Sequence, residues 1–472
     1  MIVTLALRSL LSRPVRSAVL AGGFGLGVSV MAALLGIGGV ILEQARAPQL
    51  AGGGDVVLGG SSGTLTNARF VLSGVLGSGP LSSRVAAASP SIRAGLYLID
   101  SRGTMSIRAR GGIPSLERAL GDSETRDIGV WTDTPAERAW THPDGESVLR
   151  AMDRFHPIPD VPARADSWAE WLYFNGRTSN ARFYLTFLAG PRTASGQRVV
   201  GVRLQLERAG RMTSYSASSE IPEQELLSAA PDLTAGLNRV RLEGQAYRIA
   251  LDLAPEVPGP RASAEIVVHA TAGRSLAPIV IRGAGGWVSG YTVPVMSGAL
   301  EGSIRIGRER LDLSGGTGYH DHNWGFWDGV RWQWGQVQGE DVSFVYGRVH
   351  PPADAADETR LPGFLAALGP DGPIGYATDV NIEETDDPST ERPRRIVVRG
   401  RSEGLALTMD LAIDQQTATK MGKGLFGGGL DFLQLRATYV VSGNVGGRAI
   451  SFTGPGSAET FRGARQEQPR ER

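Results

Sequence analysis

The sequence predicts a mainly β protein with two tandem antiparallel β-barrels or curled sheets behind a single N-terminal transmembrane helix. The chain has 472 residues, which is too long for one ordinary domain. From about residue 160 it consists of short stretches in which apolar and polar residues alternate, separated by glycine- and proline-rich turns. Near the N-terminus, residues 17–42 carry no charge, and this run is long enough to cross a bilayer core of roughly 30 Å.

The composition narrows the classes of function. The 48 basic and 48 acidic residues cancel to a formal net charge of zero, which argues against a nucleic-acid partner. A hydrophobic content of 41% and a charged content of 20% are typical of a globular protein. Because the chain contains no cysteine, disulfides, thiolate metal sites and cysteine nucleophiles are excluded. No cofactor is expected.

The N-terminal segment, residues 1–43, is expected to be a membrane anchor. Arg8, Arg13 and Arg16 precede the apolar run, so the positive-inside rule places the N-terminus in the cytoplasm. The apolar run is longer than that of a signal peptide, which favours a retained helix. We therefore expect a single-pass protein of the inner (cytoplasmic) membrane, with the bulk of the chain in the periplasm or another extracytoplasmic space.

A first resemblance concerns this N-terminal region. Residues 7–17 (LRSLLSRPVRS), the apolar run and residues 54–58 (GDVVL) resemble the first membrane helix and periplasmic entry of an FtsX/MacB-type ABC-exporter permease. The resemblance implies ABC-exporter subunits as partners. Residues 44–160 are expected to form an extracytoplasmic α+β segment or linker, with a short helix at 115–120.

Two β domains are expected after a proline-rich boundary at Pro157, Pro159 and Pro162. The first, 161–284, has predicted strands at 182–188, 199–206, 213–219, 238–243, 247–253 and 264–270. The second, 285–463, has predicted strands at 288–295, 299–306, 310–319, 330–338, 342–349, 363–368, 374–380, 394–400, 406–413, 433–441 and 449–453. The charged tail, 464–472, is expected to be disordered.

The most unusual stretch is 315–350, which holds four of the nine tryptophans and three of the six histidines. If 317–324 is a strand, His320, His322 and Trp324 share one face and Asp321 points the other way. A turn at 328–329 and another at 339–341 would then place three strands side by side. Their aromatic side chains, with the histidines among them, would line one cavity.

Three interpretations of this stretch compete. In the first, an apolar ligand lies against the tryptophans, and Asp321 or a histidine transfers a proton, because burial raises the pKa of an aspartic acid. The second is a metal site built from His320, His322 and His350. The third is a packed core in which the same polar side chains only make hydrogen bonds.

A second resemblance favours the first interpretation. Residues 318–325 (GYHDHNWG) are similar to the signature of the bacterial carotenoid 1,2-hydratase (hydroxyneurosporene synthase)/AttH family. Residues 168–173 (WAEWLY) and 454–459 (GPGSAE) resemble further elements of that family. The resemblance covers about 160–463 and implies two lipocalin-like barrels with a long apolar ligand, such as an isoprenoid or lipid.

The resemblance also implies a reaction, the acid-promoted addition of water to a terminal alkene. His322, His320 and Tyr346 are candidate catalytic residues, and Asp321 becomes the candidate acid because Arg348 stands where the family pattern has an aspartate. The candidate ligand-binding residues, all aromatic, are Trp171, Tyr173, Trp324, Trp327, Trp332, Trp334 and Phe344. No metal is assigned to the site. The alternative function is a non-catalytic lipid-binding or hand-over partner of an ABC exporter.

Overall fold

The computed structural model describes residues 14–15, 56–59, 65, 68, 71–72, 84–100, 103–121, 132–141, 144–271, 274–370, 372–421 and 430–463. The chain divides into two compact units, 1–66 with 87–137 and 67–86 with 138–472. The predicted membrane helix at 17–42 and the predicted tail at 464–472 lie outside the described residues. Within the described ranges, no helix is long and apolar enough to cross a membrane.

The first unit contains an antiparallel hairpin and a short helix. Strands β1 (Ser91–Asp100) and β2 (Gly103–Gly112) pair along their whole length. Helix α4 (Pro114–Ala119) follows directly, with proline at the first turn, where the missing N–H costs nothing. The helix predicted at 115–120 is therefore confirmed. Helix α5 (Pro135–Thr141) follows at the boundary between the units in the sequence.

The first β-barrel is a closed ring of eight antiparallel strands. In ring order these are β3 (Trp168–Arg177), β4 (Ala181–Arg192), β5 (Gln197–Arg208), β6 (Arg211–Pro222), β9 (Ala246–Pro255), β10 (Ala262–His269), β12 (Val288–Ile306) and β14 (Thr317–Phe326). The ring closes because β14 pairs with β3. The flanking elements are α6 (Gly145–Met152), α7 (Glu223–Ala229), β7 (Leu233–Ala235), β8 (Asn238–Glu243), β11 (Leu276–Arg282) and β13 (Glu309–Asp312).

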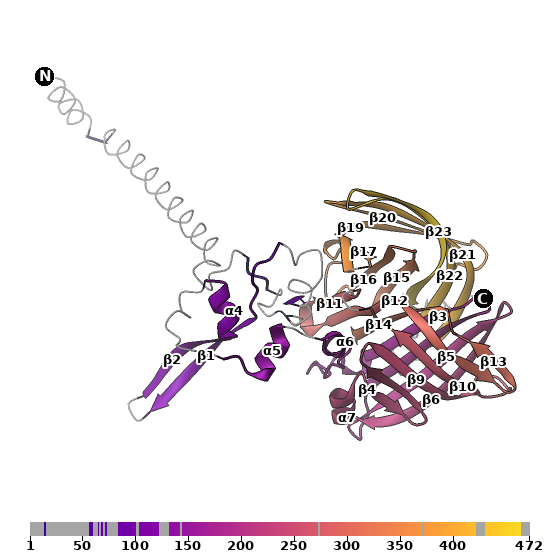
Figure 1. The fold of residues 1–472 in the computed structure, drawn as a ribbon, viewed down its shortest axis with the longest axis horizontal. Helices are drawn as coiled ribbons and strands as arrows, with labels where there is room; N and C mark the ends of the chain where they lie inside the picture. Colours follow the sequence, from indigo (N-terminus) through magenta and orange to yellow (C-terminus); the bar gives the residue numbers. More distant parts are fainter. Residues whose placement is uncertain are drawn as a thin grey trace. The chain divides into compact units, whose positions relative to one another are not determined.

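The second β-barrel is a nearly closed ring of nine antiparallel strands. From edge to edge these are β18 (Gly372–Ala377), β17 (Phe364–Gly369), β16 (Ser343–His350), β15 (Arg331–Gln338), β23 (Arg448–Gly463), β22 (Leu430–Val445), β21 (Leu405–Met421), β20 (Pro393–Ser402) and β19 (Asp379–Asp386). Figure 1 shows its brown-to-yellow strands above the magenta strands of the first barrel. The predicted mainly β architecture of two tandem antiparallel barrels is confirmed.

The boundary between the barrels does not coincide with the expected one at 284/285. Strands β12, β13 and β14 belong to the first sheet, although their residues were assigned to the second domain. The predicted side-by-side arrangement of 317–324 with the two following strands is also wrong, because β14 pairs with β12 and β3 while β15 pairs with β16 and β23. The turn at Gly329 (φ 72°) joins the two barrels and does not close a hairpin.

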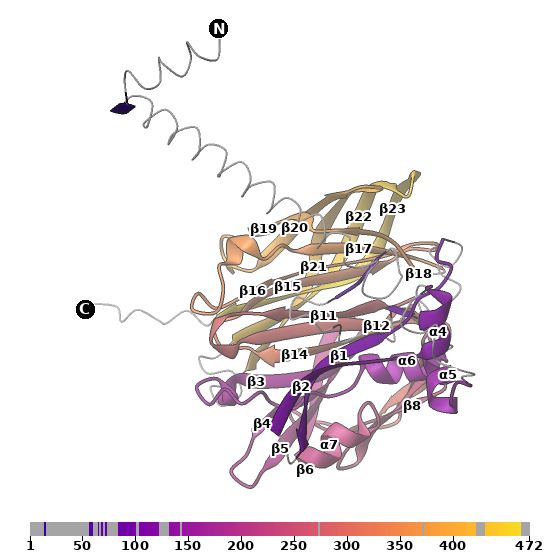
Figure 2. The ribbon, with the colours of Figure 1, turned by 90° about the vertical axis from the view of Figure 1, so that its left-hand side faces the viewer.

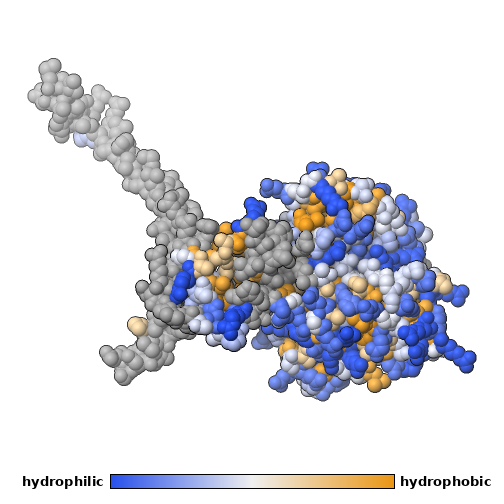
Figure 3. Space-filling view, viewed as in Figure 1, coloured by the Kyte–Doolittle hydropathy of each residue, from blue (hydrophilic) through white to orange (hydrophobic). Residues whose placement is uncertain are grey.

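Three apolar clusters fill the second unit. One lies inside the first barrel and one inside the second. The third draws residues from strands of both sheets, and we call it the aromatic layer. It includes Trp171, Tyr173, Tyr291, Tyr319, Trp327, Trp332, Trp334, Phe364 and Phe461. Figure 2 shows β11, β12 and β14 between β3 and β15, the strands that contribute many residues of this layer. In the view of Figure 3 the outer surface of the barrels is mostly polar, with small apolar patches.

Candidate functional site

Strand β14 separates two sets of polar side chains. His320 stacks on Phe174 at 4.0 Å between ring centroids, inside the first barrel. Asp321 points to the opposite side, toward the aromatic layer, where Asn323 donates a hydrogen bond to it at 2.6 Å. His320, Asp321 and His322 are all at most 1% exposed. The alternation predicted for 317–324 is confirmed, and it creates two distinct candidate sites.

The first site is a histidine–carboxylate cluster of Asp153, His156, Glu170, His320 and His322. His322 lies between two carboxylates, with Nε2 at 2.9 Å from Glu170 Oε1 and Nδ1 at 3.4 Å from Asp153 Oδ1. His156 Nδ1 lies 2.7 Å from the same Glu170 oxygen. His320 Nε2 lies 3.0 Å from Asp153 Oδ2. The cluster therefore joins β3 and β14 to the segment that follows α6.

Charge interactions dominate in this cluster. Burial alone would lower the pKa of His322, but its contacts with Asp153 and Glu170 outweigh burial and raise the pKa to about 9. Burial alone would raise the pKa of Asp153 and Glu170, but the neighbouring histidines hold both pKa values well below their usual range. The two carboxylates are therefore ionised at neutral pH.

The segment after α6 brings His156 to the cluster. The backbone N–H of His156 donates to both Glu170 oxygens, at 3.0 and 2.9 Å. Its ring stacks on Trp324 at 4.2 Å with an interplanar angle of 17°. The His156 side chain is 33% exposed, whereas Glu170 and His322 are fully buried. Solvent therefore reaches the cluster at His156.

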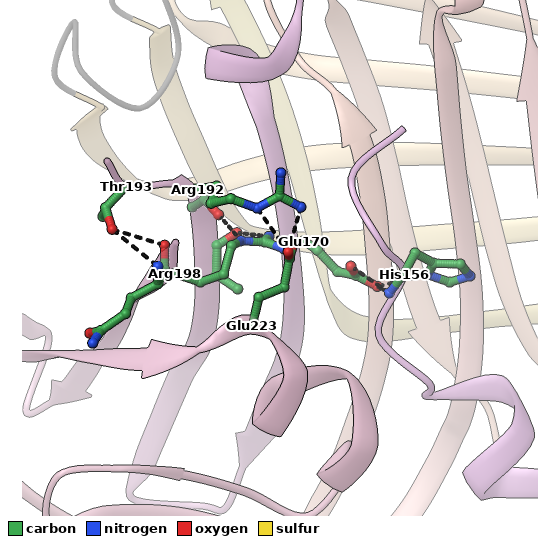
Figure 4. A network of polar contacts seen from close by, with 9 residues as sticks. His156, Glu170, Arg192, Thr193, Arg198 and Glu223 are labelled. Carbon is green, nitrogen blue, oxygen red and sulfur yellow. Dashed lines mark hydrogen bonds and ion pairs between the residues drawn. The ribbon is translucent and has the colours of Figure 1, made fainter. Parts of the chain in front are cut away.

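A buried arginine lies beyond Glu170, as Figure 4 shows. Arg198 is fully buried and donates to the backbone carbonyls of Gly190 and Ala189. Burial lowers its pKa, and the charges of Glu170 and Glu223 partly offset this. Glu223 also accepts from Arg192 at 2.8 Å, so Arg198, Glu223 and Arg192 form a charged network beyond Glu170.

The second site is an acid pair, Asp321 and Glu459, in the aromatic layer. Glu459 lies on β23 opposite Trp334 of β15. Burial, with a further contribution from the charge of Glu459, raises the pKa of Asp321 well above its usual range. Burial likewise raises the pKa of Glu459 to about 7. Burial therefore favours the protonated form of both carboxyl groups, and a protonated carboxyl can donate a proton.

Several polar atoms around the acid pair lack partners. Among the described residues, the Tyr173 hydroxyl, Glu459 Oε1 and Asn323 Oδ1 are buried and make no hydrogen bond. The Tyr173 hydroxyl does interact electrostatically with Glu459, and burial together with that charge raises its pKa well above the usual range. Buried polar atoms without partners are costly, so such a group is a candidate contact for a ligand.

Aromatic rings surround the acid pair. Trp332 and Trp334 stack at 4.9 Å with an interplanar angle of 10°. Trp171 and Trp327 lie 4.6 Å apart, and the Trp334 Nε1–H donates to the Tyr319 hydroxyl at 2.9 Å. Six of the seven candidate ligand-binding residues belong to the aromatic layer, namely Trp171, Tyr173, Trp324, Trp327, Trp332 and Trp334, and the Trp324 ring also stacks on His156.

Some sequence expectations fail for a topological reason. Phe344 and Tyr346 lie in the core of the second barrel, away from the histidines, because β16 pairs inside the second sheet and these positions face its interior. Burial raises the pKa of Tyr346 well above its usual range. His350 cannot join His320 and His322 as a metal ligand, since it contacts Glu358 at 3.2 Å and Gln333 at 3.1 Å.

Other functional candidates were missed by sequence reasoning. Asp153, His156 and Glu170 complete the histidine cluster, and Glu459 completes the acid pair. Glu170 and Glu459 both lie in segments, 168–173 and 454–459, whose resemblance to a known family was noted. That resemblance was the available signal for these two. Asp153 and His156 lie in the stretch 44–160, which was assigned to a linker, and no motif in that stretch marked them as functional residues.

Comparison with known proteins gives matches only among solved structures. No family model matches the chain, and neither does any curated protein. The chain is similar to the crystal structure of a putative AttH from Nitrosomonas europaea, with 14% identity, a TM-score of 0.44, and coverage of 65% of this chain and 99% of that one. It is also similar to CghA in complex with Sch210972, with 12% identity, a TM-score of 0.43, and coverage of 65% and 94%. Values this low say nothing about ligand or reaction.

Proposed function

We propose that the aromatic layer binds a long apolar molecule, such as an isoprenoid or another lipid, and that the acid pair donates a proton to it. The observation that carries this proposal is the burial of Asp321 and Glu459 among aromatic rings contributed by both barrels. An apolar ligand gains free energy by leaving water for such a surface, and a few polar groups fix its orientation.

The proposed reaction is the addition of water to a terminal alkene. The carboxyl group of Asp321 transfers its proton to one alkene carbon, which leaves a cation on the other. The rings of Trp332 and Trp334 stabilise that cation through their π faces. Water then adds to the cationic carbon and returns a proton to the Asp321 carboxylate, so the acid is regenerated and no other reactant is consumed.

A second candidate function is binding without reaction. The uncharged run at 17–42 and the permease-like residues 7–17 support an inner-membrane anchor and an ABC exporter as partner. In this role the barrels face the periplasm or another extracytoplasmic space and pass a lipid to or from the exporter. The same aromatic layer serves both candidate functions, so they differ in turnover and not in the ligand-binding surface.

The proposal is tested with the full-length protein purified in mild detergent. Bound lipid is extracted and identified by mass spectrometry, and an acyclic isoprenoid with a terminal trisubstituted alkene is incubated with the protein and analysed for the hydrated product. Asp321→Asn is expected to slow hydration by at least about 100-fold while ligand binding persists. Asp312→Asn, at an exposed position on β13, is the matched control.

The outcomes separate the two functions. Product formation that depends on Asp321 supports the acid-promoted reaction, and a stoichiometric lipid without product supports the hand-over role. An unchanged rate in Asp321→Asn removes this residue as the acid. If no apolar molecule is bound and no isoprenoid is hydrated, both candidate functions fail.

A further inference from the structure

We propose that His156, Glu170 and His322 bind a divalent transition-metal ion of the zinc type inside the first barrel. The His156 Nδ1, Glu170 Oε1 and His322 Nε2 atoms all lie within 4.8 Å of one another. Two imidazoles and one carboxylate are the protein ligands of many catalytic zinc sites, which keep a fourth position open. The site lies on the opposite face of β14 from the acid pair, so it does not depend on the proposed function.

An unsatisfied pair of buried atoms supports this assignment. His322 Nδ1 and Asp153 Oδ1 are both fully buried and 3.4 Å apart, and neither makes a hydrogen bond among the described residues. When Nε2 of a histidine binds a metal, its Nδ1–H usually donates to a carboxylate, which orients the ring. Asp153 stands where that carboxylate is needed, and a small rotation of the imidazole would form the bond.

The remaining ligands are held in place before any ion arrives. The His156 backbone N–H fixes both oxygens of Glu170, and the Trp324 ring fixes the plane of the His156 imidazole. Such contacts pre-organise a metal site. The partial exposure of His156 provides a route for the ion and room for a water or another ligand at the open position.

The charge of the cluster also matches a divalent ion. Binding of the ion through neutral imidazoles would displace the proton of His322 and leave Asp153 and Glu170 to supply two negative charges in a fully buried place. Isolated buried charges are costly, and one divalent ion would neutralise both. Arg198, a buried cation beyond Glu170, already contacts Glu223 and two backbone carbonyls.

Metal binding is measured on the untagged full-length protein after removal of metals with a chelator. Zn²⁺ is titrated by calorimetry, and Co²⁺ is followed by its visible absorption, which reports coordination geometry directly. We expect one ion per chain, a tetrahedral Co²⁺ spectrum and a higher melting temperature with Zn²⁺. His156→Ala is the main variant, because the His156 side chain is partly exposed whereas Glu170 and His322 are fully buried.

Zn²⁺ binding is compared among the wild type, two variants of the cluster and one control variant. His156→Ala is expected to weaken Zn²⁺ binding by at least about 10-fold, and Asp153→Asn by about 10- to 100-fold. His269→Ala is the control, since this partly exposed histidine pairs with Glu301, which is not part of the cluster. Binding of less than one ion per chain, or equal binding by the wild type and His156→Ala, would overturn the proposal. Neither result would bear on the acid pair.

Discussion

At the scale of single residues, burial and neighbouring charge decide what each titratable group of β14 can do. Asp321 faces rings and another carboxyl group, so burial keeps it protonated. His322, the next residue, faces two carboxylates, which favour its charged form despite complete burial. Adjacent residues therefore have opposite electrostatic environments, because successive side chains of a strand point to opposite faces.

Glu459 should make the protein less stable as the pH rises. Its folded-state pKa of about 7 lies above the ordinary value of 4.5 for a glutamic acid, so the folded protein binds the proton more tightly than the unfolded chain. The contribution of Glu459 to the free energy of unfolding is fully present below pH 4.5. It is lost as the pH rises through 7, and this loss is up to roughly 3 kcal/mol. Glu459→Gln should flatten this dependence between pH 5 and 8.

The measurement is the free energy of unfolding by denaturant at several pH values, for the wild type and Glu459→Gln. Glu403→Gln, in the exposed turn between β20 and β21, is the control and should keep the wild-type slope. Parallel curves for the wild type and Glu459→Gln would show that Glu459 is ionised in the folded protein.

At the scale of elements, β14 shows what the sequence could and could not predict. The two faces of 317–324 followed from period-two alternation, a local property, once this stretch was assumed to be a strand. Its extent did not, because the predicted strand 310–319 overlaps only the first residues of β14. Its pairing partners did not, because β3 lies about 150 residues earlier and no local pattern encodes such a pairing. The Asp153 and Glu170 partners of its histidines were missed for the same reason.

Gly325 should be essential to the pairing of β14 with β12. It has a φ of 148°, and an added Cβ would lie 2.6 Å from the backbone oxygen of Val288. Gly325→Ala should therefore lower the free energy of unfolding by more than about 1 kcal/mol. Gly201→Ala is the control, because nothing lies within 4 Å of its Cβ position and the change should be neutral or slightly stabilising. Equal effects in both variants would contradict this.

At the scale of the whole molecule, the two barrels share the aromatic layer and are further joined by polar contacts. Arg182 of β4 donates to the carbonyl of Gly456 at 2.9 Å, and Arg436 of β22 pairs with Glu207 of β5. The sequence correctly predicted two barrels. It could not place the boundary between them, because β12 and β14, which complete the first ring, lie after residue 284, where the first domain was expected to end.

Fragments can test this sharing of strands. A fragment of residues 161–284 lacks β12 and β14, which leaves β3 and β10 with unpaired edges, and it should not fold cooperatively. A fragment of residues 138–463 retains both rings and should fold. Near-ultraviolet circular dichroism and thermal unfolding distinguish the two. A cooperative transition in the shorter fragment would mean that the first ring can close without β12 and β14.

The most direct test of the ligand-binding surface is photo-crosslinking with a long-chain lipid that carries a diazirine in its apolar tail. After irradiation of the full-length protein, the labelled peptides are identified by mass spectrometry. We expect labels on the aromatic layer, at Trp171, Tyr291, Trp332 and Trp334, with competition by unlabelled isoprenoid. Labels confined to the core of the second barrel around Phe344, or labelling that unlabelled isoprenoid does not reduce, would contradict the proposed function.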